Sequence, residues 1–378
     1  MQHTDLSTGV NYSVNYSRRF FLSQAAQWST LLAAYPLLPL PALAESLAGD
    51  SRVAQAPIVD KGFASVRKVG DGLYATISDT SKGLETMCNG GFLYGREAAL
   101  LIEGFVSPAG AAFQYETLRT LHKGPIMGAL DTHYHFDHST GNSFYGANGI
   151  SLWAHANTAK RIVESYAPLQ GVEKSAVIGP LEARARNAKT ELARKHAAEY
   201  AATIGNVYSL VNSAILGLPN RPLDPAKLPV QLDLGGLTAV VETYPGHSGT
   251  DLIVRVPAQN VVYTGDLLFS NMYPVTFDPQ ATVSGWRSTL KTFLSWDKDT
   301  IFVPGHGQIC GRGGVQLLSD LFDDIDAQAQ KFYKAGVPAE DAGDQYLVPD
   351  KYKSVAIFAW NFSIAPTIAK LYKEWGAK

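Results

Sequence analysis

Cysteine is almost absent from this chain, which has only Cys88 and Cys310 among its 378 residues. Two cysteines without a CxxC spacing exclude a scaffold that depends on several disulfide bonds. In an oxidising compartment the two thiols can form a single bridge, and the sequence alone leaves their pairing open.

Charge is also sparse, with 17% charged residues and a formal net charge of −2 at pH 7. Such a chain lacks the excess of lysine and arginine that polyanions attract, so nucleic acid is not expected as the main partner. The hydrophobic fraction is 46%, which indicates a soluble globular protein with one large domain or two smaller ones.

The N-terminal segment differs from the rest of the chain. "SRRFFLS" places Arg18 and Arg19 before apolar residues, an apolar stretch continues to Leu40, and "ALA" ends at Ala44. This pattern resembles a twin-arginine signal peptide with its cleavage site. A membrane anchor is the alternative, but glutamines and prolines interrupt the stretch too often for a span of about 20 apolar residues. We therefore expect residues 1–44 to direct export, through the twin-arginine translocation machinery, to the bacterial periplasm or beyond.

Strand-like and helix-like runs alternate through residues 45–378, which we predict to form one domain. A helix is expected after Ser107, whose side chain can cap its first turn. Mixed strands and helices without an internal repeat indicate a layered α/β domain. The expected strands are 72–78, 91–95, 98–104, 125–132, 237–246, 260–265 and 300–305.

Two regions of this domain are predicted to be mainly helical. Residues 165–229 are expected to form an insertion, with one surface helix over 182–205 that Glu/Arg and Glu/Lys pairs four residues apart support. A proline-dense loop then leads to Pro229. The C-terminal part, 311–378, is expected to be largely helical again.

The stretch "HYHFDH", residues 133–138, holds three of the nine histidines of the chain. His133 and His135 are two positions apart, so in an extended segment their imidazoles leave on the same side and can bind one cation. Asp137 and His138 lie just beyond and can reach a second cation. A random match to H-x-H-x-D-H is expected in only about a few chains per ten thousand, so surface histidines in an ordinary turn are a poor alternative.

Three further donors, His247, Asp266 and His306, each follow a glycine at the end of a strand-like run. In open α/β sheets the carboxyl ends of strands meet at one edge, where connecting loops converge over a crevice. A single histidine or aspartate at such a position is more often structural than functional. Together with the motif, however, we expect all three to join a metal site at this edge.

These motifs resemble those of the metallo-β-lactamase superfamily of binuclear metallohydrolases. The similarity covers about residues 72–335, and the resemblance implies the αββα sandwich, in which two mixed sheets lie face to face with helices outside. It is carried by "HYHFDH" followed by Gly141 and Asn142, by "GHSGTD" from Gly246, by "YTGDLLF" from Tyr263 and by "VPGHG" from Val303.

The resemblance also implies two metal ions, each with its own set of histidines and carboxylates. Imidazole ligands suit zinc, so two Zn²⁺ are expected, although imidazole also binds iron, cobalt or manganese. The implied ligands are His133, His135 and His247 for the first metal, Asp137, His138 and His306 for the second, and Asp266 as the bridging carboxylate.

Asp266 favours one branch of this superfamily, because zinc β-lactamases carry cysteine or serine at the matching position. The aspartate is similar to that of glyoxalase II, lactonases and general hydrolases. Many relatives carry an aspartate where this chain has Glu103, which is expected to orient the metal loop in its place. Asp131 is a candidate acceptor for an imidazole N–H, and the alternative is a strand-end aspartate with no further role.

The implied chemistry is hydrolysis of a small ester, lactone, thioester or β-lactam without a serine or cysteine nucleophile. Two cations lower the pKa of a shared water from about 15.7 toward ~7 and polarise the carbonyl under attack. Asp137 is expected to accept a hydrogen bond from the resulting hydroxide as well as to bind metal. Two other classes stay open: an iron-dependent redox or dioxygenase-like protein of the same fold, and a catalytically idle metal-binding protein.

The seven residues after Asp266, "LLFSNMY", contain neither lysine nor arginine. We expect Phe269, Met272 and Tyr273 to line the substrate pocket as an apolar wall, which favours uncharged lactones or esters over penicillins and carbapenems. The alternative is that these side chains pack beneath the loop and that Arg287 reaches the cleft from the next helix.

Overall fold

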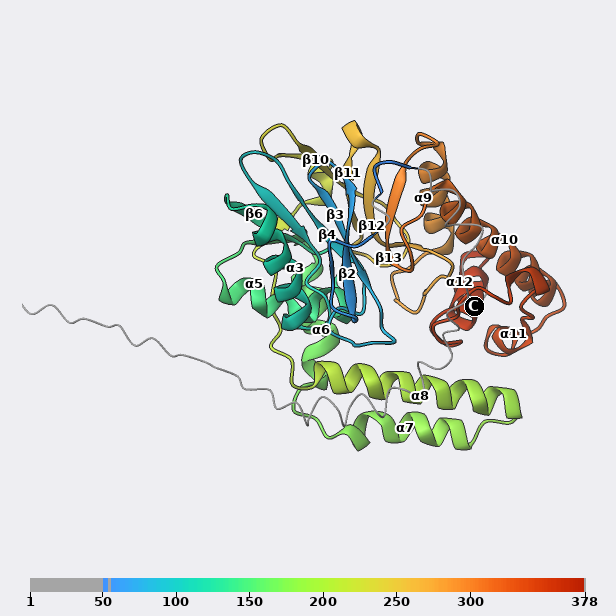
Figure 1. Cartoon of the computed structure of the whole chain (residues 1–378). Helices are drawn as coiled ribbons and strands as arrows, with labels where there is room; N and C mark the ends of the chain where they lie inside the picture. The colour runs from blue at the N-terminus through green and yellow to red at the C-terminus, as the bar shows by residue number, and fades with distance from the viewer. Residues whose placement is uncertain (1–49, 54–55, 377–378) are drawn as a thin grey trace, which may run out of the picture. The chain divides into compact units, whose positions relative to one another are not determined.

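Two β-sheets lie face to face in the computed structural model, which describes residues 50–53 and 56–376 (Figure 1). The predicted signal peptide, residues 1–44, lies outside the described residues. All described residues belong to one compact unit. No helix in this part of the chain is both long and apolar enough to cross a membrane.

The larger sheet has eight strands, and their order in space follows their order in the chain. Neighbours run antiparallel from β1 to β5 and parallel from β5 to β8. Parallel neighbours need crossover connections, and α3 (Pro108–Leu121) provides the one between β5 and β6. The strands are β1 (Val59–Asp60), β2 (Ala64–Gly70), β3 (Leu73–Ser78), β4 (Gly90–Tyr94), β5 (Ala99–Ile102), β6 (Ile126–Leu130), β7 (Leu152–His155) and β8 (Arg221–Leu223).

The smaller sheet has five strands in the spatial order β13, β12, β11, β10, β9. Only β12 and β13 pair in parallel, and the other neighbours are antiparallel. The runs named from the sequence coincide with β3 to β6, β10, β12 and β13. The strands not named were β1, β2, β7, β8, β9 and β11. The strands are β9 (Val230–Asp233), β10 (Thr238–Thr243), β11 (Leu252–Val256), β12 (Val261–Phe269) and β13 (Ile301–His306).

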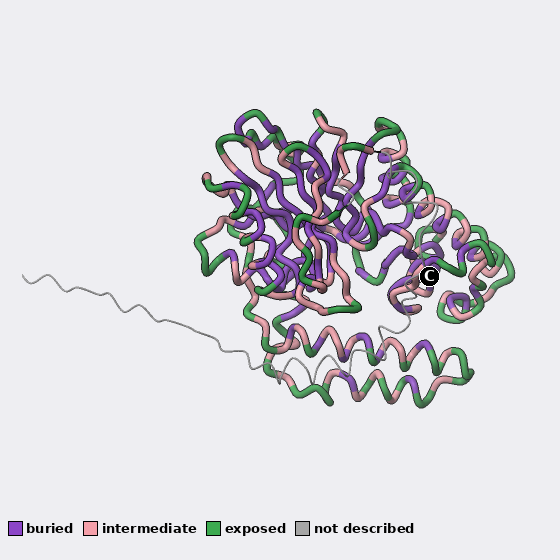
Figure 2. The backbone as a smooth tube through the Cα atoms, viewed as in Figure 1, coloured by how far each residue is buried: buried purple, intermediate pink, exposed green. Residues whose placement is uncertain are grey.

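The main core lies between the two sheets, because side chains alternate between the two faces of each strand. Leu73, Ala75 and Ile77 of β3 belong to the same buried cluster as Val241 of β10 and Val254 of β11. Figure 2 shows this buried interior running along the strands, with exposed residues in the turns and on the outer helices.

Helices cover the outer faces of both sheets. Tyr74 and Phe92, on the outer face of the larger sheet, share a second buried cluster with Phe113 of α3. On the other side, α9 (Val283–Ser295) and α10 (Arg312–Lys334) contact β12 of the smaller sheet. The predicted αββα sandwich is therefore confirmed.

The insertion contains two long helices where the sequence predicted one. α7 (Lys174–Arg186) and α8 (Glu191–Val211) pack side by side (Figure 1), so the single helix predicted over 182–205 is wrong. Thr190 starts the second helix, because its hydroxyl accepts a hydrogen bond from the backbone N–H of Ala193. Beyond α8 the proline-rich stretch also supplies β8, which can hold a proline because it is an edge strand.

The C-terminal part is helical, as predicted, with α11 (Ala339–Gln345) and α12 (Ile364–Glu374) after α10. The segment 346–363 between them lies against α8, where the side-chain amide of Asn361 donates to the carbonyl oxygen of His196 at 2.7 Å. The helical insertion and the C-terminal part are thus in direct contact.

Candidate metal centre

The motif after β6 begins in a loop without regular structure and ends in a helix. His133 and His135 precede α4 (Phe136–Ser139), and Asp137 and His138 lie in the first turn of this helix. The N–H of His138 donates to the carbonyl oxygen of His135 at 3.0 Å, which closes that turn. The change of backbone direction sends the first two side chains to one group of donors and the last two to another.

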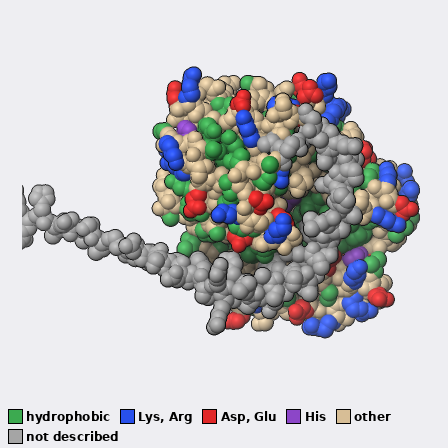
Figure 3. All heavy atoms as spheres, viewed as in Figure 1, with side chains coloured by type: hydrophobic (Ala, Val, Ile, Leu, Met, Phe, Trp, Pro, Cys, Tyr) green, Lys and Arg blue, Asp and Glu red, His purple; other side chains and the backbone are tan. Residues whose placement is uncertain are grey.

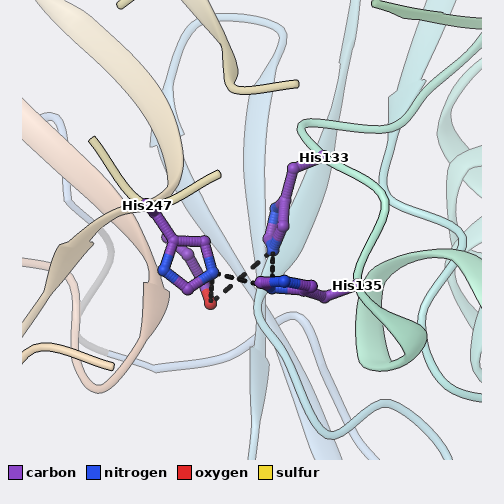
Figure 4. Close-up of side chains that lie close together, drawn as sticks. His133, His135 and His247 are labelled. Atoms are coloured by element: carbon purple, nitrogen blue, oxygen red, sulfur yellow. Dashed lines mark hydrogen bonds and ion pairs between the residues drawn. The ribbon is translucent and has the colours of Figure 1, made fainter. Parts of the chain in front are cut away.

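The first donor group contains His133, His135, His247 and Asp266, all of them buried. Nδ1 of His135 lies 3.0 Å from Nε2 of His133 and 2.8 Å from Nε2 of His247. Oδ2 of Asp266 lies 3.3 Å from Nε2 of His247 and 3.8 Å from Nε2 of His133. Figure 4 shows the three imidazoles converging on one point, two from the loop after β6 and one from the loop after β10.

The second donor group contains Asp137, His138 and His306. Nε2 of His306 lies 3.1 Å from Oδ2 of Asp137, and Nε2 of His138 lies 3.6 Å from the same oxygen. Oδ1 of Asp266 lies 3.2 Å from Nε2 of His138 and 3.4 Å from Nε2 of His306. Asp266 therefore presents one carboxylate oxygen to each group, which is the arrangement of a bridging ligand.

The sequence suggested that Asp266 follows the end of a strand, but Asp266 lies within β12. The register between β12 and β13 shifts on both sides of Gly265, whose φ is +50°. A β-carbon at this glycine would lie 2.3 Å from the hydroxyl oxygen of Thr132, so a side chain there is excluded. Because of this irregularity the side chain of Asp266 points toward His133 to His138, and β12 continues to Phe269.

The seven side chains fit two divalent cations. Within each group the donor atoms lie within 4.8 Å of one another, and imidazole nitrogens with carboxylate oxygens are the ligands that zinc and similar metals take. Nε2 of His138 and Oδ1 of Asp266 are buried without a hydrogen-bond partner in the described residues. Buried polar atoms of this kind are costly unless something satisfies them, and a cation satisfies both.

Local electrostatics prepare the first donor group and the carboxylate of Asp266 for metal. Burial lowers the pKa of His247 to about 3, and burial together with neighbouring imidazoles holds the pKa of His133 well below its ordinary value. These two rings are therefore neutral, with a lone pair available. Burial opposes ionisation of Asp266, but the adjacent His306 and His138 hold the pKa of this carboxyl well below its usual range.

Two ligands of the first group are oriented by acceptors on the loop after β12. Nε2 of His135 lies 3.1 Å from Oδ2 of Asp278, which also accepts the hydroxyl proton of Tyr134. Nδ1 of His247 donates to the carbonyl oxygen of Val275 at 2.9 Å. An acceptor at the far nitrogen fixes both tautomer and ring orientation. Sequence reasoning missed this loop, because no motif marks it.

His133 and His138 also have an oxygen atom close to the ring nitrogen that faces away from the other donors. Nδ1 of His133 lies 3.1 Å from the hydroxyl oxygen of Thr132, which donates to Oε1 of Glu103 at 2.6 Å. The same Glu103 oxygen lies 3.2 Å from Nδ1 of His138. Glu103, with φ at +77°, thus orients the metal loop as the sequence suggested.

Asp131 does not take the role of imidazole acceptor that the sequence suggested. Its Oδ2 accepts a hydrogen bond from the side-chain amide of Asn142 at 2.7 Å, and its Oδ1 has no hydrogen-bond partner in the described part of the chain. Burial and the nearby Glu103 raise the pKa of Asp131 well above its ordinary value. Asp131 therefore braces the loop through Asn142 and contacts no ligand ring by hydrogen bond.

The predicted apolar wall is also corrected, since Phe269, Met272 and Tyr273 are all buried. Phe269 stacks beneath His306 at 5.4 Å between ring centroids, and the Tyr273 hydroxyl lies 3.1 Å from that of Tyr346. These side chains pack beneath the loop, because its backbone turns them inward. The other part of the alternative, that Arg287 reaches the cleft, is not seen, because the guanidinium of Arg287 pairs with Asp326 of α10 at 2.7 Å.

The sequence profile described as "Metallo-beta-lactamase superfamily" matches residues 83–306, more than half of the chain. The chain belongs to the metallo-β-lactamase superfamily. The matched region includes every donor of both groups, from His133 to His306. Members of this superfamily are mostly metal-dependent hydrolases, and the cluster of histidines and aspartates fits that chemistry.

Individual relatives within the superfamily are distant. An uncharacterized protein of Mycobacterium tuberculosis is 26% identical over 127 residues, which cover 32% of this chain and 56% of that protein. The metallo-beta-lactamase IND-1 of Chryseobacterium indologenes is 22% identical over 211 residues, 55% of this chain and 66% of that enzyme. The chain thus spans between about half and two thirds of these relatives. The solved structure of the sec-alkyl sulfatase PisA1 shares the fold, with a TM-score of 0.58 and 14% identity over 94% of this chain and 62% of that one.

Proposed function

We propose that this protein is a binuclear zinc hydrolase that cleaves small, uncharged acyl compounds such as lactones or esters. The observation that carries the proposal is the pair of donor groups joined through the two oxygens of Asp266. Two metals held in this way lower the pKa of bound water and polarise a carbonyl, which are the two requirements of acyl hydrolysis.

The side chains around the donor groups determine where the substrate approaches and which group accepts a proton. Asp137 and His306 are the more exposed donors, with side-chain exposures of 11% and 19%, so the substrate approaches from their side. The carboxylate of Asp137 is the group that can take the proton of the attacking water. Burial raises the pKa of Cys88, and raises that of Cys310 to about 12, so neither cysteine supplies a thiolate nucleophile.

Charge around the site supports a neutral substrate. The segment from 267 to 277, which comprises the end of β12 and the loop after it, contains no lysine or arginine, so a substrate carboxylate finds no partner there. On the face drawn in Figure 3, basic and acidic side chains are interspersed without a broad area of one sign. This supports a small molecule as the substrate in preference to nucleic acid.

The test is a direct comparison of substrates on zinc-loaded protein. Neutral lactones and esters are expected to show higher kcat/KM than penicillins and carbapenems. Faster cleavage of a β-lactam that carries a carboxylate would overturn the substrate class. Metal analysis of protein purified anaerobically without added metal separates zinc from iron, and iron alone with no hydrolysis of any acyl substrate would overturn the hydrolase itself.

A further inference from the structure

Phe277 is exposed beside a metal centre whose other aromatic neighbours are buried. Its side chain is 36% exposed, and its ring stacks on that of His135 with centroids 4.9 Å apart and planes 26° apart. Phe269 and Trp286, which also contact ligand rings, are 1% and 0% exposed. Phe277 is thus an apolar surface that solvent can reach and that directly adjoins a donor.

A C-terminal segment extends this apolar surface. The ring of Phe362 lies 4.6 Å from that of Phe277, and the half-buried Phe358 lies 5.8 Å from Phe362. We call these three side chains the aromatic wall. Phe358 and Phe362 lie outside the region that the superfamily profile matches, residues 83–306. They therefore belong to a part of the chain that the superfamily profile does not describe.

Backbone hydrogen bonds hold the C-terminal segment against the loop that carries Phe277. The N–H of Tyr273 donates to the carbonyl oxygen of Ala356 at 2.8 Å, and the N–H of Thr276 donates to that of Phe362 at 2.8 Å. On its other side, Phe362 contacts Tyr200 of α8 at 5.5 Å. The wall is therefore anchored from two directions, and its rings are positioned before any ligand binds.

The cations nearest the wall are already engaged. Nζ of Lys370 donates to the carbonyl oxygen of Asp278, the residue after Phe277, at 2.6 Å. Arg161 donates to the Tyr134 hydroxyl at 2.9 Å and lies over the ring of the same tyrosine. The surface next to His135 thus offers aromatic faces without a ready partner for an anion.

We propose that the aromatic wall binds the apolar part of the substrate, an aryl group or a medium-length alkyl chain, while the scissile carbonyl lies at the metals. The inference rests on the proposed hydrolase function and adds the substrate class. Burial of each methylene group strengthens binding by about fourfold, so a wall of this kind discriminates by chain length. Phe277 contacts the ligand directly, Phe358 extends the contact, and Phe362 supports both rings from behind.

The experiment uses p-nitrophenyl esters from acetate to octanoate on the zinc-loaded full chain. The native protein is expected to show kcat/KM that rises with chain length. Phe277→Ala and Phe358→Ala are expected to lower kcat/KM for the octanoate by about tenfold, mainly through KM, and to flatten the rise of kcat/KM with chain length. Leu121→Ala is the control, since Leu121 is a similarly exposed apolar residue at the end of α3, with 39% exposure.

Metal content is measured for each variant, because Phe277 contacts His135 and its loss can disturb the first donor group. Among the ring contacts of the described residues, Phe358 pairs with Phe362 and not with a donor, so Phe358→Ala reports on the wall alone. An unchanged preference for chain length in both variants, with normal zinc content, would overturn the wall and leave the hydrolase proposal intact.

A binding measurement separates the two proposals further. Hydroxamic acids that carry a methyl or a phenylpropyl group bind zinc without being hydrolysed, and calorimetry gives their affinities. If no ester is cleaved but Phe277→Ala and Phe358→Ala weaken only the phenylpropyl compound, the wall stands and the hydrolase proposal falls. Equal affinity of the native protein for both compounds would overturn the wall.

Discussion

The carboxylate of Asp278 lies 3.1 Å from Nε2 of His135, on the side of the ring away from the other donors. When that nitrogen donates to Asp278, Nδ1 keeps its lone pair for the metal. Burial opposes ionisation of Asp278, but its hydrogen bonds with His135 and Tyr134 bring its pKa below the ordinary value. A residue 143 positions away in the sequence therefore sets the tautomer of a ligand.

Asp278→Ala is expected to lower the metal affinity of the first donor group by about 10–100-fold, because His135 loses its acceptor. Asp278→Asn keeps an acceptor oxygen, so its metal affinity should fall between that of the native protein and that of Asp278→Ala. Affinity is measured by competition with a chromophoric chelator. Asp323→Ala, which removes an exposed carboxylate of α10, is the matched control. Native affinity in Asp278→Ala would show that His135 needs no outer partner.

Asp266→Ala is expected to lose the bridge, most of the bound metal and most of the activity, while the fold survives. The fold survives because the cluster between the sheets, and not the metal, holds the strands together. Circular dichroism checks the fold and elemental analysis checks the metal. A variant with two metals per chain and native turnover would refute the bridging assignment.

Removal of metal by a chelator is expected to lower the unfolding temperature, and zinc should restore it. A ligand that binds only the folded state stabilises it by about 2.7 kcal/mol at one hundred times its Kd. Thermal scans with chelator, and then with excess zinc, measure the difference. Asp266→Ala should respond much less. Identical melting of the native protein under both conditions would mean that the two donor groups bind no metal tightly.

Gly141→Ala is expected to destabilise the fold by about 1–3 kcal/mol or more, because a β-carbon there would lie 2.1 Å from the carbonyl oxygen of Gly104. Gly146→Ala, in the neighbouring helix α5 (Ser143–Ala147), meets nothing within 4 Å and should be neutral or stabilising by about 0.5–1 kcal/mol. Urea unfolding compares the two. Equal stability of both variants would contradict the close approach at Gly141.

Changing Arg18 and Arg19 both to lysine is expected to leave the protein in the cytoplasm, because the twin-arginine pair is the part of the signal that its translocation machinery reads. Fractionation of cells that express the native chain and the double variant measures this. Recovery of the variant outside the cytoplasm at the native level would show that residues 1–44 are not such a signal.

Local pattern predicted a layered α/β domain and the ligand-bearing motif, and the resemblance to the superfamily implied the sandwich. Alternation of apolar and polar residues indicates strands such as β3. The spacing of the donors from His133 to His138 determines which of them can reach the same metal. Phe277 and Asp278 were missed because their roles exist only once a loop without regular structure folds back over the motif. The same limit applies to Phe269, which is buried beneath the ring of His306 and does not face a substrate.

The break in the predicted insertion helix has a different cause. Helix-forming residues continue through it, and only the capping hydroxyl of Thr190 indicates that a new helix begins. His196 shows how tertiary contacts decide burial: it lies on α8, yet the ring of Trp360 stacks on it at 4.6 Å, and Nδ1 lies 2.6 Å from a carboxylate oxygen of Asp344. No pattern near residue 196 contains that information.

The strand that carries Asp266 is buried along its whole length and is hydrogen-bonded to a neighbour on each side. Most of the other donors come from loops and from one short helix, which open more readily than a central strand. A transient opening of the loops that carry His135 and His247 therefore leaves the carboxylate of Asp266 in place, where it would hold bound ions until those side chains return. Loops around such an anchor can be exchanged for others, and new substrates acquired, without rebuilding the part of the site that sets the distance between the metals.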